Sequence, residues 1–213
     1  MPASKRPRRA PTDPERRRDP ERTRERILEA AVGEFGERGY SGARVSRIAA
    51  SAGVNAQLIS YYFDGKAGLY QALVSRWRGV TSAITQPGRP MDEIAAGFVR
   101  AGSRNRSFAR LLAWESLGDV PAPGEHPEVD EQEQRQADFL RRNVEDLRQR
   151  QAAGEFAADL DPGHLLLALF AMASAPTMLP QIVRRILDTD PDSPEFREAY
   201  AEQVARLVRH LMH

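Results

Sequence analysis

The chain has 213 residues, of which 41% are hydrophobic and 29% charged, a composition typical of a globular protein and too apolar for a disordered one. It contains no cysteine, which excludes disulfides, thiolate zinc sites and cysteine nucleophiles. The first residues are basic and proline-rich, and no stretch approaches the ~20 apolar residues of a membrane-spanning helix. We therefore expect a cytoplasmic protein with no membrane partner.

The charges are distributed unevenly. Residues 1–86 have 16 Lys and Arg against 9 Asp and Glu, a net charge of +7, whereas residues 87–213 have 15 against 21, a net charge of −6. A basic segment joined to an acidic one indicates a part that binds a polyanion and a part that avoids it. The alternative is a chance fluctuation combined with a solvated basic tail.

The first 19 residues differ in composition from the rest. They contain four prolines and seven basic side chains and almost nothing apolar, so they cannot contribute to a core. We interpret residues 1–19 as a disordered basic arm. The basic side chains would either track a polyanion or form a solvated tail that only raises non-specific affinity.

Two longer helices are predicted within residues 20–86. The first begins at Glu21 and ends at Gly36–Gly39, with apolar residues on one stripe at Ile27, Leu28, Ala31 and Phe35. The other runs from Lys66 to the Pro87-Gly88 pair, because proline and glycine are both unfavourable inside a helix. We take that pair as the boundary between domains at 20–86 and 87–213.

Between these helices lie two short ones. Val45–Ala52 has its apolar residues on one face and is closed by Gly53, because glycine tolerates the left-handed conformation of a tight turn. The second spans about Asn55–Tyr62. Two short helices joined by a glycine turn are typical of a helix-turn-helix.

Residues 87–213 are predicted to form about five helices and no strand, so the fold class is all-α. The expected ranges are 91–104, 106–118, 127–152, 161–187 and 194–211. The proline-rich stretch DVPAPGEHPE separates the second from the third. Pro176 and Pro180 should kink or break the helix over 161–187, because proline removes a backbone donor and clashes with the preceding turn.

Residues 23–77 closely resemble the DNA-binding domain of the tetracycline-repressor (TetR) family. The matching features are Gly39-Tyr40, Val45-x-x-Ile48-Ala49, Ala52-Gly53-Val54, Tyr61-Tyr62-Phe63 and Lys66-x-x-Leu69. The rest of the chain resembles the family only in being helical and of suitable length. The resemblance implies an N-terminal three-helix helix-turn-helix domain and a C-terminal helical domain that binds a ligand and dimerises.

The second short helix is the expected DNA reader. With Val54, Ile59 and Phe63 turned inward, its other side is free to enter a major groove. We expect base readout by Asn55, Ala56, Gln57 and Leu58. Asn and Gln can bond in pairs to adenine, and small apolar groups contact the thymine methyl. The alternative is that Asn55 is an ordinary helix cap.

Backbone phosphates would be held by residues around the reader. Tyr61, Tyr62 and Lys66 match positions that family members use for phosphates, although one tyrosine could instead belong to the core. The further expected phosphate contacts are Arg44, Ser46, Arg47 and Ser60. Ala43 and Arg44 replace the threonine or serine pair often found in the family, so the usual hydroxyl cap is in doubt, with Ser41 or Arg44 as possible substitutes.

The resemblance also implies a homodimer, a palindromic operator in double-stranded DNA and a small-molecule effector that is not identified. The expected dimer interface consists of Leu166, Phe170, Tyr200, Val204, Leu207 and Leu211. The expected pocket consists of Phe98, Leu111, Trp114, Glu115, Phe139, Phe170, Met172 and Met178. The competing explanation for both sets is that they form the core of a monomer.

Catalysis, cofactors and metal ions are not expected. The four histidines, His126, His164, His210 and His213, are scattered, and there is no Gly-rich phosphate loop or nucleophile elbow. The remaining rival is a helical adaptor or nucleoid-type protein that binds DNA without a specific operator. A repressor is the default of the family, and whether binding represses or activates depends on where the operator lies.

Overall fold

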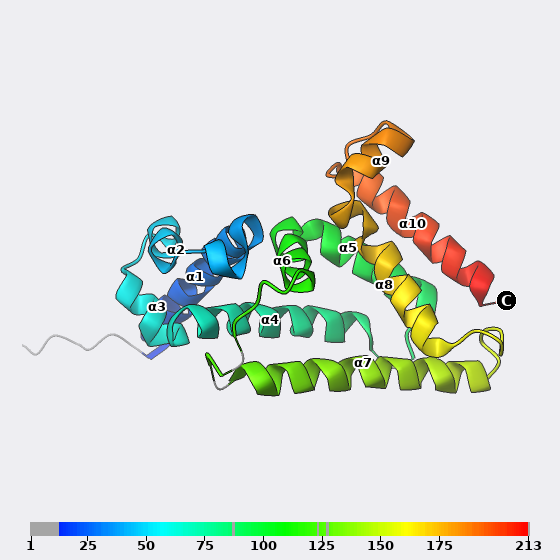
Figure 1. Cartoon of the computed structure of the whole chain (residues 1–213), viewed down its shortest axis with the longest axis horizontal. Coiled ribbons are helices and arrows are strands. Elements are labelled where there is room, and N and C mark those ends of the chain that lie inside the picture. Colours follow the sequence, from blue (N-terminus) through cyan, green and yellow to red (C-terminus); the bar gives the residue numbers. More distant parts are fainter. Residues whose placement is uncertain (1–12, 87, 123, 127, 213) are drawn as a thin grey trace, which may run out of the picture.

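The computed structural model describes residues 13–86, 88–122, 124–126 and 128–212, and every regular element in them is a helix (Figure 1). The all-α prediction is therefore confirmed. The helices are α1 (Asp13–Gly42), α2 (Val45–Ala52), α3 (Ala56–Phe63), α4 (Gly65–Ile84), α5 (Met91–Arg104), α6 (Arg106–Ser116), α7 (Glu128–Ala152), α8 (Pro162–Met178), α9 (Pro180–Leu187) and α10 (Pro194–Leu211).

The buried apolar side chains form two clusters. The first is formed by the four helices α1, α2, α3 and α4, with fully buried Ile27, Phe35, Ile48, Ile59 and Leu69. It also includes Phe108 and Leu111 of α6. We call this cluster with its helices α1–α3 and the start of α4 the head. The second joins α5, α7, α8 and α10 through side chains such as Val99, Leu147, Leu169, Val204 and Val208. Burial in both clusters keeps apolar area out of water and so stabilises each.

The helix α4 links the two clusters, and α7 runs alongside it (Figure 1). The helix α6 stands between the head and the helices of the second cluster. Because Phe108 and Leu111 of α6 pack in the first cluster, α6 belongs to the C-terminal part of the chain by sequence and to the head by packing. The proposed boundary at residues 86 and 87 stays a prediction.

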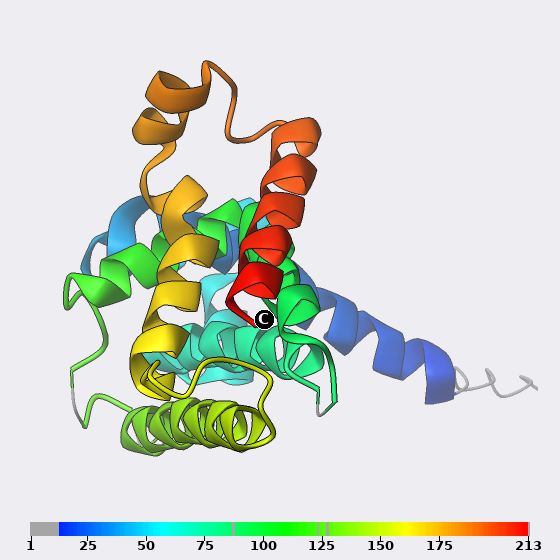
Figure 2. The ribbon, with the colours of Figure 1, turned by 90° about the vertical axis from the view of Figure 1, so that its right-hand side faces the viewer.

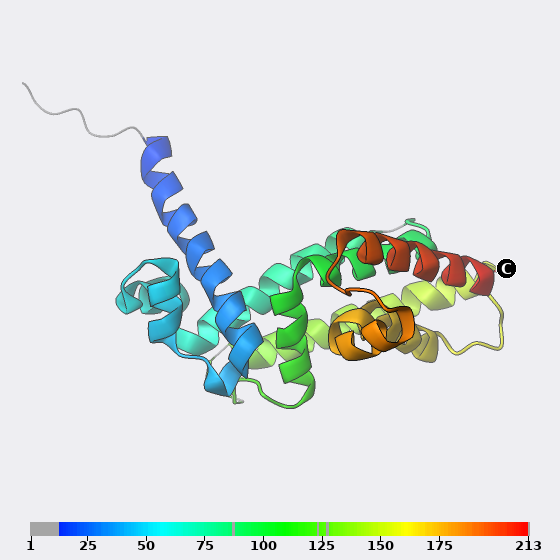
Figure 3. The same ribbon diagram turned by 90° about the horizontal axis from the view of Figure 1, so that it is seen from above.

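The helix α1 begins earlier than the sequence pattern indicates. Its backbone is helical from Asp13, so residues 13–19, assigned to the disordered arm, are helical. Proline is tolerated in a first helical turn, and Glu and Arg are good helix formers. Residues 1–12 lie outside the described part of the chain. Figures 2 and 3 show this end of α1 projecting away from the other helices.

The end of α1 is interrupted at Gly39. This residue has φ 69° and ψ 179°, a conformation open to glycine alone, and a last short turn continues to Gly42. The predicted end at Gly36–Gly39 thus coincides with the break in the helix. Gly53, with φ 63°, closes α2 as predicted.

The predicted helix over 161–187 is two helices. Pro176 lies buried inside α8, whereas Pro180 is the first residue of α9, and α8 and α9 are bent by 84° at their junction. Proline fits the first position of a helix because no intrahelical partner exists there for an N–H group. No single described helix is long and apolar enough to cross a membrane; only this bent pair reaches that length and composition when taken together.

Candidate nucleic-acid interface and ligand cavity

The helices α2 and α3 form the predicted helix-turn-helix. Gly53 donates its N–H to the carbonyls of Ala49 and Ala50, which satisfies the end of α2. Asn55 precedes α3, and its Oδ1 accepts the N–H of Gln57 at 3.0 Å. The side-chain oxygen of Asn55 therefore has a partner within the protein, which supports its interpretation as a helix cap.

One side of α3 is buried in the head and the other faces solvent. Ile59 and Phe63 are buried, whereas Ala56, Gln57 and Ser60 are exposed and Leu58 is half-buried. Helical spacing therefore leaves the start of α3 free to contact a partner.

The two tyrosines of α3 differ in exposure. Tyr61 is 79% exposed. Tyr62 is half-buried, packs against the first cluster and meets the Tyr61 ring edge-on, with centroids 5.2 Å apart. The prediction that one of the tyrosines could belong to the core fits Tyr62.

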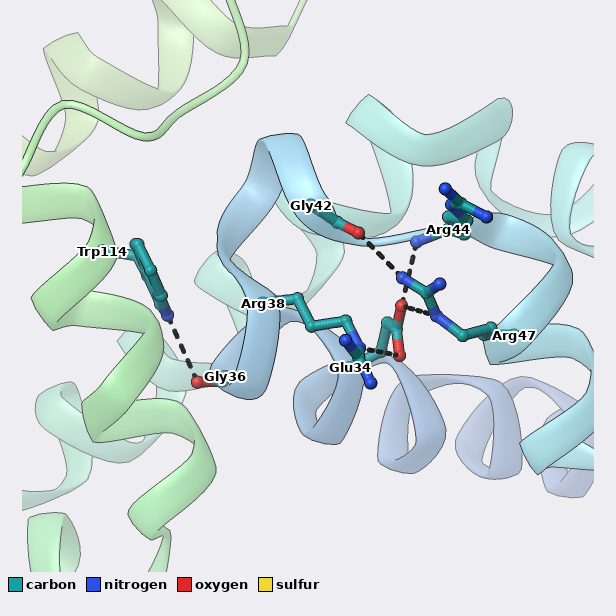
Figure 4. A network of polar contacts seen from close by, with 7 residues as sticks. All are labelled: Glu34, Gly36, Arg38, Gly42, Arg44, Arg47 and Trp114. Atoms are coloured by element: carbon teal, nitrogen blue, oxygen red, sulfur yellow. Dashed lines mark hydrogen bonds and ion pairs between the residues drawn. The ribbon is translucent and has the colours of Figure 1, made fainter.

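The start of α2 is held by Glu34 of α1, which sequence reasoning missed (Figure 4). Its Oε1 accepts the backbone N–H of Arg44 at 3.0 Å and the Nε–H of Arg47 at 2.5 Å, and Arg47 also donates to the carbonyl of Gly42 at 2.8 Å. Arg38 lies 3.5 Å from the second carboxylate oxygen. Glu34 thus binds an N–H group at the helix start where the family often has a hydroxyl residue.

The carboxyl of Glu34 is kept ionised by these neighbours. Burial by itself raises the pKa of Glu34, but the hydrogen bonds from Arg47 and Arg44 and the charges of Arg47 and Arg38 outweigh it and hold the pKa below its usual value. The guanidinium of Arg47 is consequently committed to the protein, whereas the Arg44 and Ser46 side chains are exposed. No sequence pattern signals this contact, because Glu34 lies on another helix.

Lys66 lies at the start of α4, beside the turn between α1 and α2. Its Nζ is 4.5 Å from the centroid of the Tyr40 ring and donates to the carbonyl of Ser41 at 3.4 Å. A cation over an aromatic face is attracted by the ring quadrupole. The predicted phosphate residue is thus positioned by the end of α1.

A cavity of about 410 Å³ lies between α4, α5, α6, α7 and α8. Four residues predicted for the pocket line it: Phe98, Phe139, Phe170 and Met178. Among the residues that line it are also Trp77, Leu112, Asn143 and Asp146, which the sequence did not single out. A cavity walled by aromatic side chains with a few polar groups has the composition of a small-molecule site.

The other four predicted pocket residues are not among the described residues that line the cavity. Leu111 is fully buried in the first cluster, and Trp114 donates its Nε1–H to the carbonyl of Gly36 at 3.3 Å. Met172 packs on the second cluster, and its carbonyl accepts the Tyr200 hydroxyl. Glu115 is half-buried on α6.

Four of the polar residues that line the cavity come from the end of α4 and from α7: Ser82 on α4, Thr85 directly after it, and Asn143 and Asp146 on α7. Asp146 is paired to Arg150, whose Nε lies 2.7 Å from the carboxylate, and Arg150 also donates to the carbonyl of Arg89. Ser174 and Thr177 of α8 also line the cavity, so polar groups are interspersed among its aromatic and apolar side chains.

The residues predicted for the dimer interface differ in how exposed their side chains are in the single chain. Phe170, Leu207 and Leu211 are exposed, Leu166 lines the cavity, and Tyr200 is half-buried. Val204 is only 2% exposed and belongs to the second cluster, so its assignment to an interface is a mistake: the same apolar spacing that favours an interface also fits a face turned to α5. Further exposed apolar residues on α8 and α9 are Leu167, Ile182, Ile186 and Leu187.

Comparisons with known proteins agree with this arrangement. Residues 27–73 match the model of bacterial regulatory proteins of the tetR family, and residues 91–206 match the tetracyclin repressor-like C-terminal domain. The chain is 32% identical over 195 residues to the HTH-type transcriptional repressor SCO4008 of Streptomyces coelicolor, covering 90% of this chain and 97% of that protein.

Solved structures share the fold. SCO4942 from Streptomyces coelicolor is 24% identical with a TM-score of 0.68, covering 88% of this chain and 97% of that one. The ketosteroid transcriptional regulator KstR2 of Mycobacterium tuberculosis is 17% identical with a TM-score of 0.66, covering 88% and 93%. Because family models match both parts and SCO4008 is matched along almost its whole length, the chain belongs to the TetR family of bacterial regulatory proteins and is a DNA-binding transcriptional regulator, not an enzyme.

Proposed function

We propose that the chain is a dimeric repressor that binds a palindromic operator through α3 and leaves the DNA when a small molecule fills the cavity. The observation that carries this proposal is the exposed start of α3, with Gln57 directed away from the buried Ile59 and Phe63. A helix presented in this way can enter a major groove, where a Gln side chain pairs with adenine. Such a protein works where the chromosome is, in the cytoplasm.

The first experiment is selection of bound fragments from random-sequence DNA by the full chain. A discrete palindrome with half-sites about 34 Å apart is expected. At that spacing the two α3 helices of a dimer enter successive major-groove turns on one face of the DNA duplex. Smooth, salt-dependent binding to every sequence would instead identify a non-specific nucleoid-type protein and overturn the proposal.

The variant Gln57→Ala tests the reader. We expect it to lose the preference for one base pair in each half-site, which corresponds to about 1–3 kcal/mol of discrimination. Ser51→Ala, at an exposed position on α2, is the control and should leave the selected sequence unchanged.

We propose that two copies associate through exposed apolar side chains of α8, α9 and α10. Leu167, Ile186 and Leu207 are 68%, 71% and 54% exposed in the single chain, and exposed large apolar groups in neighbouring helices are typical of an interface. The dimer would also set the spacing of the two α3 helices. Sedimentation that shows only monomer at micromolar concentration would contradict this.

The cavity supports an effector that is mostly apolar and carries a few polar groups, for which Asn143, Thr85 and Ser174 are available partners. A volume of about 410 Å³ suits a drug-sized molecule. The structurally similar KstR2 is named a ketosteroid transcriptional regulator, and a ketosteroid is a mostly apolar molecule. Such a ligand would release the DNA only by binding more tightly to a form whose heads are spaced differently. A Phe98→Trp variant, which narrows the cavity, should keep operator affinity and weaken the response to ligand.

A further inference from the structure

Three side chains of the segment between α6 and α7 reach the DNA-binding head. Asp119 Oδ1 accepts the backbone N–H of Ser41 at 3.0 Å, and Glu125 Oε1 accepts the hydroxyl of Tyr40. His126 Nε2 lies 3.7 Å from the Asp64 carboxylate, at the junction of α3 and α4. We call Asp119, Glu125 and His126 the loop clasp. Asp119 and Glu125 join the C-terminal part of the chain to the end of α1, and His126 joins it to the junction of α3 and α4.

Tyr40 connects the loop clasp to Lys66. Its ring is buried, packs edge-on against Tyr70 with centroids 5.3 Å apart, and lies beneath the ammonium group of Lys66. Lys66 also donates to the carbonyl of Ser41, whose N–H is held by Asp119. Both groups that orient the ammonium are therefore themselves bound by the loop clasp.

The geometry of Glu125 suits a fixed acceptor. Its second carboxylate oxygen accepts the N–H of Ala122 at 3.0 Å, which ties the side chain to its own segment. Burial, and then the hydrogen bond to Glu125, raise the pKa of Tyr40, so the phenol stays protonated and remains a donor.

The close approach of Asp119 depends on a glycine. A Cβ added to Gly39 would lie 1.9 Å from Asp119 Oδ2 and 3.0 Å from Trp114 Cδ2. The backbone of α1 thus leaves room for the carboxylate at the point where Gly39 interrupts the helix. The contact is built into the fold and does not depend on chance positions of surface side chains.

We propose that Glu125 and Asp119 are positioning residues for DNA binding, which hold the Tyr40-Ser41 turn and thereby direct Lys66 at a backbone phosphate. The inference rests on the proposed role of Lys66 as a phosphate contact. A lysine carries its charge on a flexible four-carbon stem, and fixing that stem before binding removes an entropic cost from association.

The positioning role and simple electrostatics predict opposite changes in DNA affinity when Glu125 is removed. Removing an acidic side chain from a DNA-binding protein should tighten its binding, because the duplex is a polyanion. Positioning by Glu125 predicts that Glu125→Ala weakens binding instead. Glu125→Gln removes the charge but keeps an acceptor for the Tyr40 hydroxyl, so it should bind at least as tightly as the parent.

The experiment measures affinity for the selected palindromic duplex over a range of salt concentrations, with the full chain and its variants. Glu125→Ala is expected to weaken binding about three- to tenfold and to reduce the dependence on salt toward that of Lys66→Ala. The double variant Glu125→Ala, Lys66→Ala should bind no more weakly than Lys66→Ala alone, because the same contact is already lost.

Two further variants keep the test decisive. Tyr40→Phe retains the buried ring and removes only the hydroxyl, so it tests the same link if Glu125→Ala perturbs folding; it should weaken binding similarly. Glu145→Ala removes an exposed carboxylate of α7 that pairs with Arg148, and should not weaken binding.

The positioning role of Glu125 and the phosphate contact of Lys66 would be overturned by different results. Unchanged or tighter binding by both Glu125→Ala and Tyr40→Phe, or additive losses in the double variant, would overturn the positioning role while Lys66→Ala still weakens binding. Unchanged affinity and salt dependence in Lys66→Ala would overturn the phosphate contact in the proposed function, and the positioning role with it.

Discussion

Trp77 of α4 and Phe108 of α6 stack with their ring centroids 4.4 Å apart and 21° between their planes. Trp77 lines the ligand cavity, and Phe108 is buried in the first cluster with the helices of the head. This aromatic pair therefore connects the lining of the cavity to the core of the head. A ligand that displaces Trp77 would press directly on a side chain that packs against α1 to α4.

This relationship makes Trp77 a reporter of the effector. The chain has two tryptophans, so Trp114→Phe leaves Trp77 as the sole one. We expect a ligand that releases the duplex to change the fluorescence of that variant. Trp77→Phe retains Trp114, which lies outside the cavity lining and should respond weakly. A ligand that releases DNA without changing Trp77 emission would place the effector site elsewhere.

Two neighbouring positions on α10 should separate stability from assembly. Val204→Ala removes buried methyl groups and should lower the free energy of unfolding by about 2 kcal/mol, with dimerisation unchanged. Leu207→Ser changes an exposed side chain and should weaken the dimer with little effect on the fold. Denaturant unfolding and sedimentation at fixed concentration measure the two. An unchanged dimer in Leu207→Ser would exclude this face of α10 from the interface.

The Glu34 carboxylate should stabilise the head in a pH-dependent manner. Glu34→Ala leaves the Arg44 N–H and the buried part of Arg47 without their acceptor, and should cost about 2 kcal/mol near pH 7. The folded-state pKa of Glu34 is depressed, so its contribution is complete above the ordinary value of 4.5 and is lost as pH falls through the folded pKa.

Unfolding of the parent and of Glu34→Ala at a series of pH values measures this contribution. The difference between the two should shrink as the solution becomes more acidic than the ordinary pKa. A difference that stays constant, or that grows toward acid pH, would show that the ion pairs of Glu34 do not stabilise the head.

Asn55 should act through its cap. Asn55→Ala should destabilise the protein by about 1 kcal/mol, because the N–H of Gln57 loses its acceptor, whereas Asn55→Ser should keep most of the stability. If the cap is its main role, Asn55→Ser also keeps the operator preference in the selection experiment. A changed base preference in that variant would instead return Asn55 to base readout.

Two glycines of α1 should respond in opposite directions to alanine. Gly39→Ala places a Cβ against Asp119 in a left-handed backbone conformation, and should destabilise the head by more than about 2 kcal/mol. Gly33 has nothing within 4 Å of an added Cβ, so Gly33→Ala should stabilise the helix by about 1 kcal/mol. Thermal unfolding compares the two. Equal stability would mean that the turn at Gly39 can relax.

Local patterns in the sequence were sufficient for the secondary structure and for the helix-turn-helix. The apolar stripe of α1, Gly53 and the start of α3 are short-range features, and helical spacing alone separates Ile59 and Phe63 from Gln57. Residues 13–19 are helical although we predicted a disordered arm. Their composition shows only that they can bury little apolar area, and it does not show whether their backbone forms a helix.

Tertiary packing decided which apolar faces meet. Val204 and Leu207 belong to one apolar pattern on α10, yet only the packing of α5 buries the first and leaves the second exposed. The same holds for Glu34, Glu125 and Asp119, whose partners lie on other segments of the chain. Hydrogen bonds and cavities join groups that are distant along the chain, and periodicity along one helix carries no information about which helix lies opposite.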